Sequence, residues 1–60
     1  MRHLNLKQCK KDHFQCQYFD TETNTWQDDV LLGIVGNSAD HYLIGVDAKQ
    51  IPAEYVRNKL

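Results

Sequence analysis

The sequence predicts an all-β fold, either a single small antiparallel barrel or a strongly curled sheet of about five strands. Two short apolar runs, residues 30–35 and 41–46, flank a stretch of turn-forming residues. Residues 13–19 alternate polar and apolar side chains, which is the pattern of a strand with one solvent-exposed face. Closing or curling such a sheet would protect its apolar strands from pairing with other chains.

The two apolar runs predict a β-hairpin. If residues 36–40 form its loop, Val35 pairs with His41, Gly33 with Leu43, and Leu31 with Gly45. The even-numbered positions then share one face, which we expect to be the core side: Val30, Leu32, Ile34, Tyr42, Ile44 and Val46. The opposite face alternates leucine with glycine, and we expect the chain's own ends or a partner to cover it.

The elements before this hairpin are less regular. Leu4 and Leu6 alternate with polar residues, which fits a short first strand or a loosely held end, and residues 7–12 are polar and loop-like. The strand at 13–19 should place Phe14, Cys16 and Tyr18 on one face.

Residues 20–25 predict a turn between that strand and the one that begins at Trp26. Asp20 can bond the local backbone, and Asn24 suits a left-handed conformation. After the second apolar run, residues 47–50 predict a connector that leads to the last segment of the chain.

The segment Ile-Pro-Ala-Glu-Tyr-Val at 51–56 resembles the end of SH3 domains, where a 3₁₀ turn leads into a last short strand, here residues 55–59. The resemblance implies an SH3-like fold. It also implies a groove for proline-rich peptides, lined by Trp26, Pro52 and Tyr55. The alternative for this segment is a short helix that begins at Pro52, which would give a three- or four-stranded antiparallel sheet with a C-terminal helix.

Length and composition indicate one small globular domain that spans residues 1–60. A hydrophobic content of 42% with 25% charged residues is typical of globular proteins. The sequence contains neither an apolar run of transmembrane length nor a signal-peptide pattern, so we expect a cytoplasmic protein without a membrane partner.

The net charge of −1 conceals an uneven layout. Residues 1–11 contain four basic residues and no acidic ones, whereas residues 12–48 contain seven acidic residues and no lysine or arginine. A basic end and an acidic middle can steer a partner of opposite charge, and they also allow self-association into a homo-oligomer.

Three potential metal ligands, Cys9, His13 and Cys16, lie close together in the sequence. Their spacing is not a standard zinc pattern, and a small buried thiol is the ordinary explanation for Cys16, on a strand face with Phe14 and Tyr18. We therefore expect no cofactor, and a zinc-stabilised domain is kept as a second alternative.

No catalytic motif is present, and a domain of this length seldom encloses a cleft, so we expect no enzymatic activity. The leading hypothesis is a non-catalytic protein-interaction module or small accessory protein that binds a larger protein. Exposed aromatic residues and an acidic flank would form its contact surface: Trp26, Tyr55, Pro52, Tyr18, Asp28 and Asp29.

The alternative function is a small β-barrel that binds nucleic acid. If the two ends of the chain lie side by side, one basic patch would result from Arg2, Lys7, Lys10, Lys11, Arg57 and Lys59. A nearby aromatic ring could then stack on a base.

Overall fold

The computed structural model describes residues 4–36 and 40–60. One five-stranded antiparallel sheet dominates the fold, with the strand order β4-β3-β2-β1-β5. In sequence order its strands are β1 (Gln15–Asp20), β2 (Thr25–Val35), β3 (His41–Ile44), β4 (Lys49–Pro52) and β5 (Val56–Asn58). A short helix, α1 (Leu6–Lys11), precedes them, and a 3₁₀ turn, η1 (Ala53–Tyr55), joins β4 to β5.

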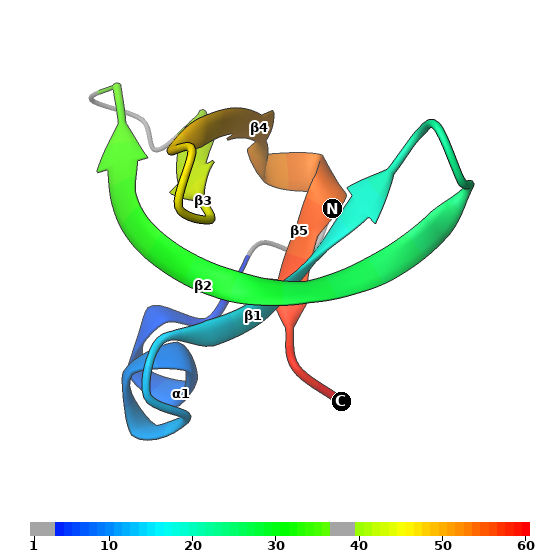
Figure 1. Ribbon diagram of the computed structural model, residues 1–60. Helices are drawn as coiled ribbons and strands as arrows, with labels where there is room; N and C mark the ends of the chain where they lie inside the picture. Colours follow the sequence, from blue (N-terminus) through cyan, green and yellow to red (C-terminus); the bar gives the residue numbers. More distant parts are fainter. Residues whose placement is uncertain (1–3, 37–39) are drawn as a thin grey trace.

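The predicted all-β class is confirmed in its curled-sheet form, because the sheet is strongly bent but remains open. β2 curves along its whole length (Figure 1), and its two parts pair with different neighbouring strands on opposite edges. Its first part, Thr25–Val30, pairs with β1, and its second part, Leu31–Val35, pairs with β3. The 3₁₀ turn and last strand also form where expected, so the C-terminal helix is ruled out.

The β1–β2 hairpin forms as its turn residues predict. The Asp20 carboxylate accepts a hydrogen bond of 2.9 Å from the backbone N–H of Glu22, which stabilises the start of the turn. Asn24 adopts the left-handed conformation, with φ of 57°. Asparagine tolerates this region better than most residues with a side chain, and the turn is therefore closed without a glycine.

The N-terminal segment differs from the expectation of a strand followed by a loop, because residues 6–11 form α1. The side chain of Asn5 caps the helix by accepting a hydrogen bond of 3.1 Å from the N–H of Gln8. So short a helix is unstable alone in water. Burial of Cys9, which is fully shielded from solvent, anchors it to the sheet.

The β2–β3 hairpin has the expected register at its loop end, with Val35 opposite His41 and Gly33 opposite Leu43. Residues 37–39 of the expected loop lie outside the described residues. The expected pairing of Leu31 with Gly45 is wrong. A register shift between Leu31 and Gly33 places Leu31 opposite Ile44 instead, which is the effect of one extra residue in β2.

The burial of the β2 side chains also differs from the prediction. Leu31 is 7% exposed and packs in the core, whereas Val30, Leu32 and Ile34 are 36%, 56% and 44% exposed. The prediction that Val30, Leu32, Ile34 and Val46 line the core is therefore wrong. It is correct for Tyr42 and Ile44, which belong to β3 and are buried.

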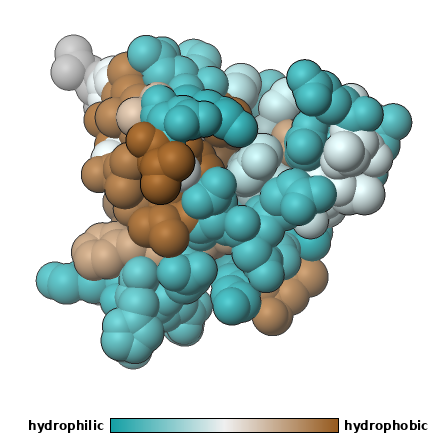
Figure 2. Space-filling model, viewed as in Figure 1, coloured by the Kyte–Doolittle hydropathy of each residue, from teal (hydrophilic) through white to brown (hydrophobic). Residues whose placement is uncertain are grey.

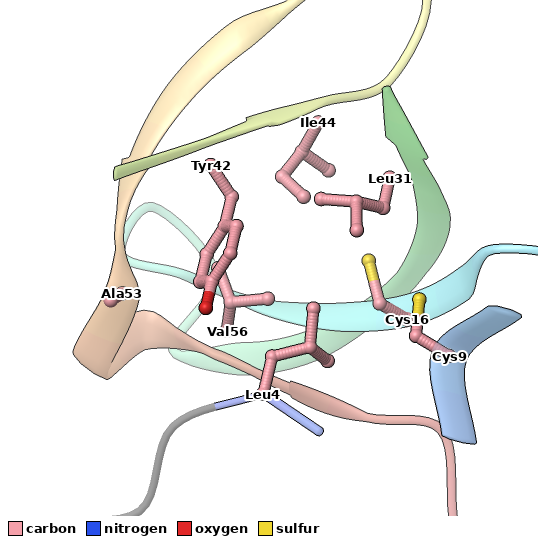
Figure 3. Packing of buried hydrophobic residues seen from close by; sticks show 8 residues of the cluster. All are labelled: Leu4, Cys9, Cys16, Leu31, Tyr42, Ile44, Ala53 and Val56. Carbon is pink, nitrogen blue, oxygen red and sulfur yellow. The ribbon is translucent and has the colours of Figure 1, made fainter. Parts of the chain in front are cut away.

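The core lies between the curved sheet and segments from both ends of the described chain (Figure 3). Leu4 and Cys9 reach it from the N-terminal side, and Ala53 and Val56 from the C-terminal side. The ends thus pack with Tyr42 and Ile44, on the predicted core face, and not on the leucine–glycine face that they were expected to cover. The remaining core residues come from the strands: Cys16, Leu31, Tyr42 and Ile44.

Candidate functional site

An apolar groove is the most distinctive surface of the molecule. It consists of five large hydrophobic side chains that are all at least one-third exposed: Leu6, Phe14, Val30, Leu32 and Ile34. They line a hollow of about 680 Å³ between α1 and the second part of β2. Figure 2 shows the apolar surface gathered on this side of the molecule.

Phe14 is held at the groove by an unusual backbone conformation. His13 and Phe14 both have positive φ, 58° and 62°. In this conformation their N–H groups donate to the last free carbonyls of α1, from His13 to Lys10 at 3.2 Å and from Phe14 to Cys9 at 2.8 Å. This arrangement ends the helix as a Schellman motif does, with histidine where glycine is usual.

That backbone explains why Phe14 departs from the expected strand face. The strand starts only at Gln15, so Phe14 does not follow the alternation of Cys16 and Tyr18. Its ring is 47% exposed instead of buried. Left-handed non-glycine residues cost roughly 1 kcal/mol or more each, and such strain is concentrated at functional sites.

The charged residues at the groove are basic. Lys10 is the charged side chain among the described residues that line the hollow, His13 lies beside it, and none of these lining residues is an aspartate or glutamate. Two further basic residues of α1, Lys7 and Lys11, are also exposed. The groove therefore combines an apolar floor with a positively charged margin.

A second surface contains part of the site predicted from the sequence. The Trp26 ring lies 5.5 Å from the Phe19 ring, edge to face, and Phe19 lies 6.2 Å from Tyr55. The Arg57 guanidinium stacks 4.0 Å from the centre of the Trp26 ring. We call these four residues the aromatic cluster. Phe19 was not among the predicted site residues, and Arg57 was predicted only for the nucleic-acid alternative.

The other predicted contact residues lie elsewhere. Tyr18 is half-buried against the core, with the Lys49 ammonium 5.6 Å from its ring. Pro52 is half-buried at the end of β4, opposite His41. Asp28 accepts a hydrogen bond of 2.8 Å from Gln17, while Asp29 accepts one from the N–H of Val30.

The described basic residues proposed for nucleic acid are distributed over several surroundings. Lys11 and Lys59 line one hollow together with His13 and Asp12. Lys10 belongs to the apolar groove, Arg57 is stacked on Trp26, and Arg2 lies outside the described residues. The two ends of the described chain do lie side by side, since Asn5 and Asn58 exchange hydrogen bonds of 2.8 and 3.0 Å.

The structure brings together two of the three candidate metal ligands and leaves the third apart. Cys9 and Cys16 are fully buried with free thiols, and their side chains lie close together in the core (Figure 3), whereas His13 is exposed. Within residues 4–36 and 40–60, no group of three or more His, Cys, Asp or Glu side chains is placed to hold a metal ion.

Burial governs the chemistry of the core thiols. Desolvation raises the pKa of Cys16 to about 12, and the neighbouring Cys9 and Asp29 add to the rise. Burial and the nearby Asp12 also raise the pKa of Cys9. Both thiols are therefore protonated at neutral pH, which is the opposite of what a nucleophilic cysteine requires.

The groove residues were missed because their sequence pattern predicted burial. The signal that could have identified them is the uninterrupted apolar run at 30–35, which places large side chains on both faces of one strand. So small a domain has no second layer to cover both faces.

Comparisons with protein-family models, with curated proteins and with solved structures found no match. None of the described helices has the length and apolar character needed to cross a membrane.

Proposed function

We propose that this chain is a non-catalytic protein-interaction module that binds a larger protein through the apolar groove. The observation that supports the proposal is the set of five large hydrophobic side chains around one hollow, each 36% to 56% exposed. Contiguous exposed apolar surface on a small domain is typical of a protein contact site.

The groove is a better centre for such a contact than the aromatic cluster. Arg57 already covers one face of the Trp26 ring, and Phe19 contacts its edge. A partner at the cluster would have to displace these contacts, whereas the groove side chains are open to solvent. Trp26, Tyr55 and the acidic Asp28 then lie outside the proposed contact.

An energy estimate indicates how much the groove can contribute. Covering a half-exposed large apolar side chain stabilises a complex by about 1 kcal/mol, so five contribute about 5 kcal/mol. Association costs roughly 4 to 15 kcal/mol in lost freedom of motion. Apolar contact alone would thus give weak binding, and polar contacts must supply the remaining binding free energy.

The test compares groove and cluster variants in affinity capture from nuclease-treated cell lysate. We expect a defined partner protein to be retained by the wild-type chain and by Tyr55→Ala, and lost by Leu32→Lys. Both side chains are exposed, so both variants should keep the wild-type unfolding temperature. Equal retention by folded Leu32→Lys would contradict the proposal.

A second candidate function, nucleic-acid binding, is favoured by one observation. The hydrogen bonds between Asn5 and Asn58 tie the two basic ends together, and Lys11 and Lys59 line one hollow. The nearby Asp12 and the pI of 6.2 weigh against a strong phosphate site.

Binding to a fluorescent single-stranded oligonucleotide tests this candidate. Phosphate contacts predict an affinity that falls steeply as salt rises, and that is lowered further by Lys11→Gln combined with Lys59→Gln. An affinity that does not change with salt, or no binding at low salt, would exclude it.

A further inference from the structure

The second part of β2 has one open side. Leu31–Val35 pairs with β3, and β1 pairs only with the first part of the strand. The last link on the β1 side is the hydrogen bond of 2.8 Å from the N–H of Leu31 to the carbonyl of Phe14. Beyond it, residues 32–35 are paired with no strand on that side within the described chain.

The open side faces the apolar groove. On one side of the hollow lie Leu6 of α1 and Phe14, which connects α1 to β1 in a left-handed conformation. On the other side lie Leu32 and Ile34 of β2. An unpaired strand edge next to an apolar hollow offers two kinds of contact at once. The backbone provides hydrogen-bond donors and acceptors, and the hollow receives alternate side chains of an added strand.

The charges at the groove favour an acidic partner segment. Lys10 and His13 line the hollow, and no described carboxylate does. A second copy of this chain fits less well, because a two-fold axis through the groove would place the same basic residues of both copies at one contact.

We propose that the edge at residues 32–35 binds an extended segment of a partner protein as an added β-strand. Alternate apolar side chains of that segment occupy the apolar groove, and a carboxylate next to them pairs with Lys10. This inference rests on the proposed protein-interaction function and specifies its binding mode. Backbone pairing supplies the polar contacts that the groove alone lacks.

The experiment begins with a random peptide library displayed on phage and selected against the folded chain. We expect the selected peptides to alternate apolar residues and to contain aspartate or glutamate. Synthetic versions should protect the backbone amides of residues 32–35 from hydrogen exchange. Methylation of one paired peptide nitrogen should weaken binding about fivefold or more, because it removes a backbone hydrogen bond.

Two charge variants on α1 provide a matched comparison. Lys10→Glu should weaken binding of the acidic peptides about tenfold, and replacing the peptide's acid with lysine should restore it. Lys7→Glu makes the same charge change outside the hollow, so it should weaken binding much less.

The outcomes separate the binding mode from the function. If Leu32→Lys abolishes peptide binding but nitrogen methylation and amide exchange have no effect, the groove binds proteins and strand addition is wrong. If the peptides bind folded Leu32→Lys as well as wild type, the groove itself is wrong. If no peptide is selected and the chain dimerises through Leu32, the occupant is a second copy and the proposal is overturned.

Discussion

Gly45 lies directly against the carboxylate of Asp29. A Cβ atom added to Gly45 would be 2.9 Å from Oδ2 of Asp29, closer than such atoms approach in proteins. The φ of Gly45 is also positive, at 79°. Its N–H donates to the carbonyl of Val30 at 2.9 Å, which joins the end of β3 to the middle of β2.

Gly45→Ala should therefore lower the free energy of unfolding by more than about 1 kcal/mol, measured by urea unfolding. Two causes contribute, the contact with Asp29 and the left-handed backbone. The double variant with Asp29→Ala removes the contact and should recover part of the loss. A fully additive double variant would show that the contact contributes nothing.

Neighbouring leucines in β2 should respond very differently to truncation. Leu31→Ala should destabilise the fold by about 2 to 5 kcal/mol, because Leu31 is 7% exposed and packs in the core. Leu32→Ala should change stability by no more than about 0.5 kcal/mol, because Leu32 is 56% exposed. Thermal unfolding of the Leu31→Ala and Leu32→Ala variants tests the register shift. A larger loss of stability in Leu32→Ala than in Leu31→Ala would refute it.

The turn after β3 should tolerate glycine better than its native residue. Ala48 has φ of 51°, and its N–H donates to the carbonyl of Gly45 at 2.9 Å. Ala48→Gly should raise the free energy of unfolding by about 0.5 to 1 kcal/mol, because glycine adopts this conformation without strain. Asn24→Ala is the opposite control, since it introduces a residue less tolerant of a left-handed turn, and it should destabilise. A destabilised Ala48→Gly variant would contradict the assigned backbone.

Stability should fall at alkaline pH because of Cys16. Burial raises the thiol pKa from 9.0 to about 12, so the unfolded chain loses this proton at a lower pH than the folded one. The contribution of the protonated Cys16 thiol to the free energy of unfolding is complete below pH 9.0 and decreases as pH rises toward 12. The decrease amounts to at most about 1.4 kcal/mol per pH unit.

Urea unfolding under reducing conditions, from about pH 8 to about pH 11, measures this slope. Cys16→Ala should flatten it, although the raised pKa values of Cys9 and Tyr42 leave a smaller slope of the same sign. An unchanged slope in the variant would show that Cys16 is not the main cause.

The parts of the fold that local chemistry dictates were predictable from the sequence. Asp20 and Asn24 close the β1–β2 turn as side chains of their type do, whereas the 3₁₀ turn after Pro52 was expected from a family resemblance and local chemistry there favoured a helix. The β1–β2 turn depends on a few adjacent residues whose backbone preferences agree with the fold.

The errors arise where tertiary contacts outweigh local pattern. Alternating Leu4 and Leu6 suit a strand, but burial of Cys9 stabilises a helix there instead. β4 has no apolar alternation, and its pairing with β3 makes it a strand. The shift between Leu31 and Gly33 leaves no mark in the sequence, because either neighbouring leucine could equally fill the core.

Misassigned burial explains why the candidate site was predicted only in part. Trp26 and Tyr55 stood out as exposed aromatics, and the structure brings them together through Phe19. Leu32 and Ile34 were assigned to the core, so the groove they form could not be anticipated. The register alone would not have revealed this site, because Ile34 pairs with Tyr42 as expected and is still 44% exposed.

The hydrogen bonds between Asn5 and Asn58 have a consequence for synthesis on the ribosome. The two residues are 53 positions apart, and the strand β5 that pairs with β1 consists of residues 56–58. A nascent chain cannot make these contacts until its last strand has left the exit tunnel. The link between the N-terminal segment and β5 therefore forms later in synthesis than the contacts of α1 with β1, which lie close together in the sequence.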